Sequence, residues 1–170
     1  MKFLIRLVLA TSILMLAAPV IAGDKSGTGC KVLGSWMGYD ESGSAWWIST
    51  ADGQNASHGT LNLEVPGSVV FFPGAASVTE LRGVWEKTGE NTFEWTVIGF
   101  PYDATAATVV LARLSGKNII NEGCDSEIVK NVVMEVFLPD ADLNSDNPFS
   151  VSYFPDHLGY RIKLSSPELP

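Results

Sequence analysis

The stretch VTELRGVWEKTGENTFEWTVIGFPY, residues 78–102, indicates the fold class of this chain. It contains two runs rich in Val, Thr, Trp and Phe, Val78–Lys87 and Thr92–Tyr102, which flank Gly89-Glu90-Asn91. β-branched and aromatic residues favour strands, and a short connection containing Gly between two such runs is typical of a β-hairpin. The stretch therefore predicts two neighbouring antiparallel strands.

Short runs of the same kind occur on both sides of this hairpin. In Gly59–Val65 apolar and polar residues alternate, so that Leu61 and Leu63 share one face of a strand. The other runs are Leu33–Tyr39, Ser44–Thr50, Val69–Phe72, Ala106–Leu114, Asn118–Asn121, Ser126–Leu138, Ser150–Phe154 and Tyr160–Leu164. Their spacing of about 8–12 residues favours a β-barrel or a β-sandwich.

The expected fold is all-β, a single antiparallel up-and-down β-barrel of about 8–10 strands. Sequential hairpins with short turns favour the barrel, because closing the sheet removes its exposed edges. The alternative is a β-sandwich of the immunoglobulin type. Cys30 and Cys124 stand 94 residues apart, which is too far for the inter-sheet disulfide of one such domain.

The amino terminus has the layout of a secretory signal peptide. Lys2 and Arg6 give a positive start, and the apolar run Leu7–Ile21 ends in small residues before Gly23. The run is shorter than the ~20 residues that a membrane-spanning helix needs. We therefore expect residues 1–22 to be cleaved and residues 23–170 to form one barrel domain, exported to the bacterial periplasm or outside the cell and not inserted in a membrane.

The composition excludes several classes of protein. With 46% hydrophobic and 18% charged residues, the chain is neither disordered nor rich in cysteine. Without residues 1–22, which hold two of the 11 Lys and Arg, the charge is 9 − 19 = −10. An acidic surface of this kind argues against nucleic-acid binding and against docking on anionic lipid.

The two cysteines predict one disulfide. An exported protein with two thiols most often pairs them, and a bridge between Cys30 and Cys124 would close a long loop. The alternative is two separate buried thiols.

A family resemblance begins at Gly34-Ser35-Trp36, at the start of the first predicted strand. It resembles the Gly-x-Trp signature of lipocalins and related calycin barrels. The resemblance implies that Trp36 closes the barrel floor and that Arg161, from the last strand, packs over it. Residues 83–93 are also similar to a recurring pattern in small exported bacterial β-proteins of unassigned function.

Aromatic and cationic side chains on predicted strands are the candidate ligand contacts. Trp46, Trp85, Phe93 and Trp95 would line a cavity for a small apolar molecule, or would simply fill the core. Trp46 and Trp47 are adjacent and face opposite sides of a strand, so one of them would lie outside the barrel, as a partner contact or as a half-exposed ring.

Two cations also fall on apolar faces of predicted strands. Arg113 shares a face with Leu111, and Lys130 shares one with Ile128 and Val132, so each would meet a ligand carboxylate inside a barrel. The alternative is that a β-bulge shifts the register by one residue and both cations reach solvent.

A calcium loop is a weaker candidate. Asp140, Asp142, Asn144 and Asp146 place oxygen ligands at alternate positions, as in the opening of a calcium-binding loop. Ser145 stands where the sharp turn requires Gly, so a polar hairpin loop is the alternative.

Catalytic motifs are absent from the sequence. It has two histidines, His58 and His157, and neither a Gly-x-Ser-x-Gly nor a His-Glu-x-x-His pattern. The predicted function is therefore non-catalytic binding of a small, mainly apolar ligand, with no cofactor. The alternatives are an isomerase- or cyclase-type enzyme in the same cavity and an interaction module that uses exposed aromatic residues.

Overall fold

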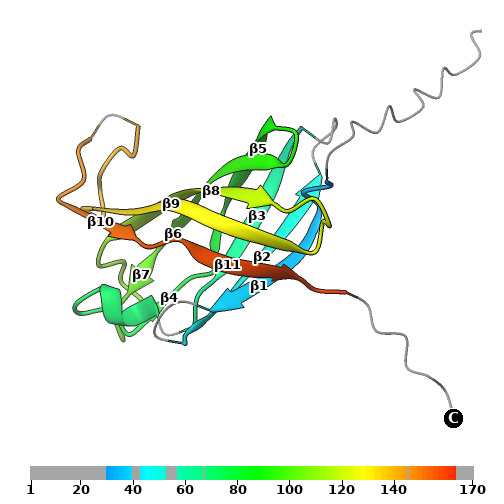
Figure 1. Ribbon diagram of the computed structural model, residues 1–170. Helices are drawn as coiled ribbons and strands as arrows, with labels where there is room; N and C mark the ends of the chain where they lie inside the picture. Colours follow the sequence, from blue (N-terminus) through cyan, green and yellow to red (C-terminus); the bar gives the residue numbers. More distant parts are fainter. Residues whose placement is uncertain (1–29, 40–42, 53–56, 67, 145, 164–170) are drawn as a thin grey trace, which may run out of the picture.

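Pairing between the first and last strands closes the sheet into a barrel (Figure 1). The structure is a computed structural model that describes residues 30–39, 43–52, 57–66, 68–144 and 146–163. Trp36 in the first strand pairs with Arg161 in the last, and each strand between them pairs with its neighbours in antiparallel fashion. The predicted signal peptide, residues 1–22, lies outside the described residues. Within the described ranges, no helix is long and apolar enough to cross a membrane.

Eight antiparallel strands form the closed barrel of the described chain. They are β1 (Gly34–Tyr39), β2 (Ala45–Asp52), β3 (His58–Glu64), β5 (Leu81–Gly89), β6 (Thr92–Gly99), β8 (Leu111–Ile120), β9 (Ser126–Phe137) and β11 (His157–Arg161). One further strand, β10 (Ser150–Phe154), extends the sheet beside β9, and β4 (Ser77–Val78) pairs with β7 (Pro101–Tyr102) in a small separate sheet. The predicted all-β barrel is confirmed, and the sandwich alternative is excluded.

β10 and β11 together form one interrupted strand along β9. Ser150 pairs with Val136 and His157 pairs with Val129, so the register is unchanged on the two sides of the interruption. The break lies opposite Lys130 and Asn131, and the backbone of Asn131 has a φ of 54°. A residue in this left-handed conformation bends the strand locally, as β-bulges do.

Several predicted strand boundaries were wrong. The run Ala106–Leu114 begins too early, since β8 starts at Leu111, and Tyr160–Leu164 begins too late, since β11 is His157–Arg161. Val69–Phe72 lies between Pro66 and Pro73, and η1 (Ser68–Phe71) is a 3₁₀ helix rather than a strand. The hairpin runs are each interrupted, which separates β4 from β5 and β6 from β7.

A further error concerns Ser115-Gly116, which lies between the two predicted strands Ala106–Leu114 and Asn118–Asn121. The chain continues through it as one long strand, β8, with a register shift between Ser115 and Lys117. A Cβ atom at Gly116 would lie 2.5 Å from the indole of Trp95. Gly116 therefore marks the close approach of a ring and not a chain reversal.

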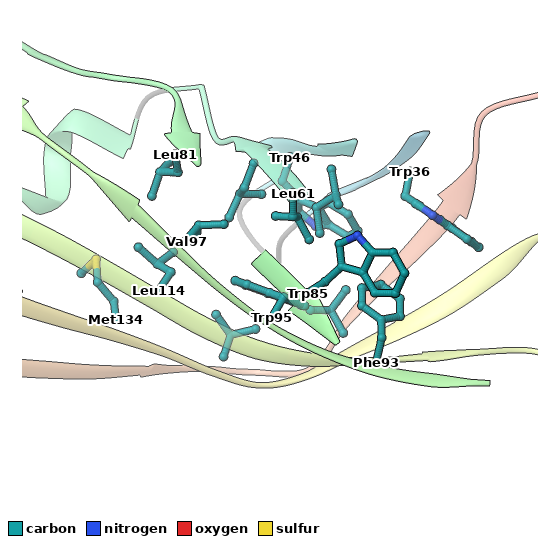
Figure 2. Packing of buried hydrophobic residues seen from close by; sticks show 14 of the residues in the cluster. Trp36, Trp46, Leu61, Leu81, Trp85, Phe93, Trp95, Val97, Leu114 and Met134 are labelled. Carbon is teal, nitrogen blue, oxygen red and sulfur yellow. The ribbon is translucent and has the colours of Figure 1, made fainter. Parts of the chain in front are cut away.

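Large aromatic side chains fill one half of the barrel. Trp36, Trp85 and Phe93 are completely buried, and the rings of Trp85 and Phe93 pack edge to face with centroids 6.2 Å apart (Figure 2). Such rings each bury about 150–250 Å² and contribute strongly to the stability of the core. This half of the interior is packed with side chains.

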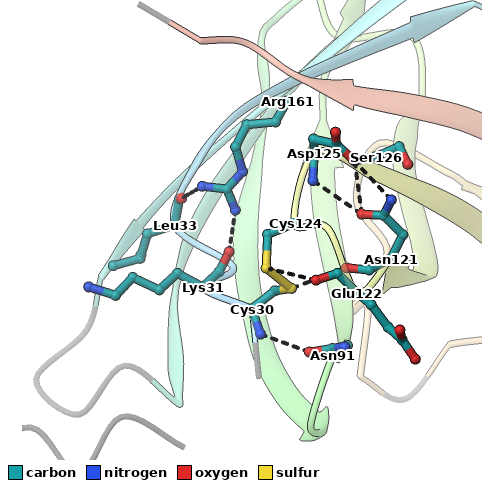
Figure 3. Close-up of a disulfide and its surroundings, with 10 residues drawn as sticks. All are labelled: Cys30, Lys31, Leu33, Asn91, Asn121, Glu122, Cys124, Asp125, Ser126 and Arg161. Carbon is teal, nitrogen blue, oxygen red and sulfur yellow. Dashed lines mark hydrogen bonds between the residues drawn. A yellow bond between two sulfur atoms is a disulfide. The ribbon is translucent and has the colours of Figure 1, made fainter. Parts of the chain in front are cut away.

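A disulfide closes the same end of the barrel. Cys30 and Cys124 are bonded, with Cα atoms 5.4 Å apart, which confirms the predicted pairing (Figure 3). Cys124 lies in a turn that Asn121 stabilises, since its Oδ1 accepts hydrogen bonds from the backbone N–H groups of Asp125 and Ser126. The bond therefore ties the segment before β1 to the turn between β8 and β9.

Arg161 also fixes the segment that precedes β1. Its guanidinium lies over the Trp36 ring, 4.4 Å from the ring centroid, and donates hydrogen bonds to the carbonyl oxygens of Lys31 and Leu33 (Figure 3). The Trp36 indole in turn donates to the Val32 carbonyl over 3.2 Å. Residues 30–33 are thus fixed across the closed end.

Candidate ligand cavity

The other half of the barrel contains a cavity of about 90 Å³. Thirteen of its fifteen lining residues are apolar, and the two polar ones are Ser44 and His157. The apolar residues are Trp46, Ile48, Leu63, Val65, Phe71, Phe72, Leu81, Trp95, Leu114, Val129, Val132, Met134 and Phe154. An apolar cavity with few polar groups is the usual form of a small-molecule site.

Aromatic rings from η1 and β10 close one side of this cavity. Phe71 of η1 and Phe154 of β10 pack edge to face with centroids 5.8 Å apart. Both rings line the cavity, and Phe71 is also partly exposed to solvent. The wall between cavity and solvent is therefore one ring thick at this position.

Two of the four predicted aromatic contacts lie at the cavity. Trp46 and Trp95 line it, whereas Trp85 and Phe93 belong to the packed half (Figure 2). The Trp46 indole lies across the inner faces of β1 and β11, where a Cβ atom at Gly38 or Gly159 would come within 2.5 Å of the ring. Because Gly38 and Gly159 have no side chains, the Trp46 ring can pack directly against the backbone at these positions.

Arg113 lies on the outer face of the barrel. Its Nε donates to Glu135 over 2.7 Å, and its Nη1 donates to the Leu143 carbonyl over 2.6 Å. The guanidinium also stacks on Phe137, 4.9 Å from the ring centroid. Arg113 therefore fastens the loop after β9 to the sheet instead of facing a ligand in the cavity.

Lys130 also lies outside the cavity. It forms an ion pair with Asp156 over 2.9 Å, across the break between β10 and β11. The irregular backbone at Asn131 changes which residues face inward, so that Val129 and Val132 are buried while Ile128 is partly exposed. This is the register shift that the alternative interpretation of the sequence described.

A buried carboxylate that the sequence analysis missed lies beyond the cavity wall. Glu127 is 1% exposed and Asn118 is completely buried. The Trp95 indole donates to Asn118 Oδ1 over 2.6 Å, which leaves the Asn118 Nδ2 on the side towards Glu127. In the described structure this Nδ2 and both carboxyl oxygens of Glu127 lack a hydrogen bond of good geometry.

Burial raises the pKa of Glu127 to about 7. The neighbouring Asn118 amide and the charge of Arg161 both lower that pKa, but they offset only part of the desolvation. Alternation in the sequence gives no signal for Glu127, because the spacing of Val129, Val132 and Met134 is recognised only once their burial is known. A gap of three followed by a gap of two indicates a bulge, which moves Glu127 and not Ile128 to the inner face.

In the predicted calcium loop, carboxylate oxygens accept hydrogen bonds from backbone N–H groups of the loop itself. Asp146 Oδ2 accepts from the Asp142 backbone N–H over 2.8 Å, and Asp142 Oδ1 accepts from the Asn144 N–H over 2.9 Å. Ser145 lies outside the described residues. Across the described ranges, three or more His, Cys, Asp or Glu side chains nowhere gather in a way that could hold a metal ion. The structure brings no ligand set together here.

An apolar strip crosses the outer face of five neighbouring strands. In one row Tyr39 pairs with Leu158, Leu158 with Ile128 and Ile128 with Ile119; in the next row Trp47 pairs with Met37 and Met37 with Tyr160. We call these seven residues the outer apolar strip. Six of them are more than a third exposed. A contiguous exposed patch of this kind is typical of an interaction surface.

The fold thus offers two candidate sites, the cavity and the outer apolar strip, and both are defined by this chain's own residues. No protein-family model, curated protein sequence or solved structure matches the chain.

Proposed function

We propose that this protein binds a small, uncharged, mainly apolar molecule inside the barrel. The observation that carries the proposal is the apolar cavity between β-strands on one side and η1 and β10 on the other. Trp36, Trp85 and Phe93 are fully buried in the closed half of the barrel, whereas the cavity lies in the other half. A cavity of about 90 Å³ takes a group of a few carbon atoms as it stands, and a longer alkyl chain or a ring must displace part of the wall at Phe71 and Phe154.

The charges around the cavity favour an uncharged ligand. None of the lining residues of this cavity is Lys or Arg, since Arg113 and Lys130 pair with carboxylates outside it. The carboxyl group of Glu127 lies behind the lining in a region of low dielectric. A fatty-acid carboxylate would lose its hydration there and gain no cation in return.

We further propose that the barrel is related to the lipocalin-like calycin proteins and that the protein is exported. The stacking of Arg161 on Trp36 supports the first proposal, because the Gly-x-Trp resemblance implies that contact. The disulfide supports the second, because such bonds persist in oxidising compartments. Binding is preferred to catalysis because Glu127, the buried carboxylate, lies behind the cavity lining and not in it.

The test of ligand binding uses butylbenzene and the methyl resonances of the cavity. Titration should shift the NMR signals of Val132, Leu114 and Met134, which line the cavity, more than those of the exposed Val84. Met134→Trp should fill the cavity and abolish the shifts, with Val132→Phe as a second filling variant. Val84→Phe is the control that adds a ring outside. Equal shifts at Val84 and at the lining residues, or full binding by both filling variants, would contradict the proposal.

The outer apolar strip supports a second candidate function, self-association. The strip carries no charge, so two copies of an acidic chain can meet there without direct like-charge contact. Sedimentation equilibrium should then show a dimer, and Leu158→Lys, which places a charge in the centre of the strip, should convert it to a monomer. Val84→Lys places the same charge on an exposed position outside the strip and should leave the dimer intact. A monomeric wild-type protein at all concentrations would rule this function out.

A further inference from the structure

The buried polar pair Glu127 and Asn118 lies directly behind the cavity wall. Trp95, which lines the cavity, donates its indole hydrogen bond to Asn118, and Val129, which also lines it, is the cross-strand partner of Asn118. Trp46 reaches the same place from β2: its Cη2 and the Glu127 Cγ both lie within 3.0 Å of the point where a Gly159 Cβ would be. One layer of side chains therefore separates the pair from the cavity.

The two side chains face each other and the Asn118 amide lowers the pKa of Glu127, but in the described chain neither the Asn118 Nδ2 nor the Glu127 oxygens complete a hydrogen bond of good geometry. Asn118 Nδ2 is a donor, and the oxygens of Glu127 are acceptors when the group is ionised. Buried polar atoms of this kind are rare in folded proteins, because each unmade hydrogen bond costs free energy. Their position behind an apolar cavity makes them candidates for recognition of a ligand.

We propose that Glu127 and Asn118 form a subsite that recognises the hydroxyl group of an otherwise apolar ligand; this rests on the cavity binding proposed above. A hydroxyl group both donates and accepts one hydrogen bond. It would donate to a Glu127 oxygen and accept from Asn118 Nδ2, so one ligand group satisfies both partners. A carboxylate ligand cannot donate, and an alkane or haloalkane can do neither of these. The ligand class is therefore a slender alcohol or phenol.

The Trp46 ring must move before the hydroxyl group of a ligand can reach Glu127 and Asn118. Within the described structure its Nε1 has no hydrogen-bond partner, in contrast to Trp95 and Trp85, whose indoles each donate to a fixed acceptor. The ring rests against Gly38 and Gly159, which have no side chains to hold it. A shift of the Trp46 ring therefore breaks no hydrogen bond of that indole.

The test compares 1-octanol with 1-chlorooctane, which has a similar shape but no hydroxyl group. At pH 8, above the pKa of about 7 of Glu127, we expect Glu127→Met to weaken octanol binding by about tenfold and to change chlorooctane binding by no more than about twofold, because a hydrogen bond to a charged group is lost for octanol alone. Glu135→Met, on the outer face of the same strand, is the matched control and should change neither affinity.

A second measurement uses the wild-type protein and does not depend on the variant folding. The side-chain amide resonances of Asn118 should shift with octanol and stay in place with chlorooctane, while the lining methyl groups respond to both probes. Equal effects of Glu127→Met on the two probes, or an unchanged Asn118 amide in the octanol complex, would overturn the subsite and leave the cavity proposal standing. Failure of both probes to bind the wild-type protein would overturn the cavity proposal and the subsite with it.

Discussion

Replacement of both cysteines, Cys30→Ala with Cys124→Ala, is expected to lower the free energy of unfolding by about 4–5 kcal/mol. The disulfide closes a loop of 94 residues, and a crosslink over such a length removes much of the conformational freedom of the unfolded chain. Domains of this size are commonly stable by only about 5–15 kcal/mol, so the loss is a large part of the total. Urea unfolding followed by tryptophan fluorescence measures it.

The reduced wild-type protein is the control for this prediction. It keeps both sulfur atoms and should lose a similar amount of stability, which separates the crosslink from the packing of the Cys30 side chain. Arg161 and Thr50 still bind residues 31–33 in the variant, so the folded barrel should persist at low denaturant. A loss below about 1 kcal/mol in both cases would contradict the loop-closure argument.

Glu127→Gln is expected to stabilise the protein by about 3 kcal/mol at pH 8. The folded state holds the Glu127 proton with a pKa of about 7, whereas the ordinary value is 4.5. Because the pKa is raised on folding, the stability that the neutral group contributes is fully present below about pH 4.5 and is lost as the pH rises through 7. Glutamine stays neutral over the whole range, so the variant avoids this loss.

The measurement is the free energy of unfolding between pH 4.5 and pH 8 for both proteins. The wild-type curve should fall through this window relative to the variant, and the two should converge at the acid end. The charge of Arg161 acts on Glu127, and this guanidinium stays charged over the whole range. Glu135→Gln on the outer face of the same strand is the control. Parallel curves for wild type and Glu127→Gln would disprove the raised pKa.

The general architecture of the barrel could be predicted from the sequence because it depends on local patterns. The alternation in Gly59–Val65 and the hairpin around Gly89-Glu90-Asn91 both correspond to strands in the structure. The pattern also favoured closure of the sheet, since closing an up-and-down sheet into a barrel removes its edges altogether. Pairing of the two cysteines was predictable from their number and the expected compartment.

The polar part of the site was not predictable from simple alternation. A bulge near Asn131 changes the inward-facing set from Glu127 and Val129 to Val132 and Met134, and a strict period of two placed Lys130 on the inner face instead. The bulge belongs to the pairing of β9 with β8, where the register shifts between Ser115 and Lys117, and alternation within β9 alone does not show it. The cavity has a similar origin, because η1 covers it from a segment that the pattern assigned to a strand.

Closure of the barrel by β1 and β11 has a consequence for the order of folding. Trp36 and Arg161 are 161 − 36 = 125 residues apart, so a ribosome must synthesise almost the whole chain before the first strand meets its second neighbour. The disulfide partner at residue 124 precedes the last strand in the chain and, once the chain is in an oxidising compartment, can restrain the amino-terminal segment before β11 pairs with β1. Contacts of such long range slow folding, and an unpaired strand edge in a nascent chain invites pairing with other chains. Pairing of β11 with β1 is therefore the step that removes the exposed strand edges and, with them, the risk of aggregation.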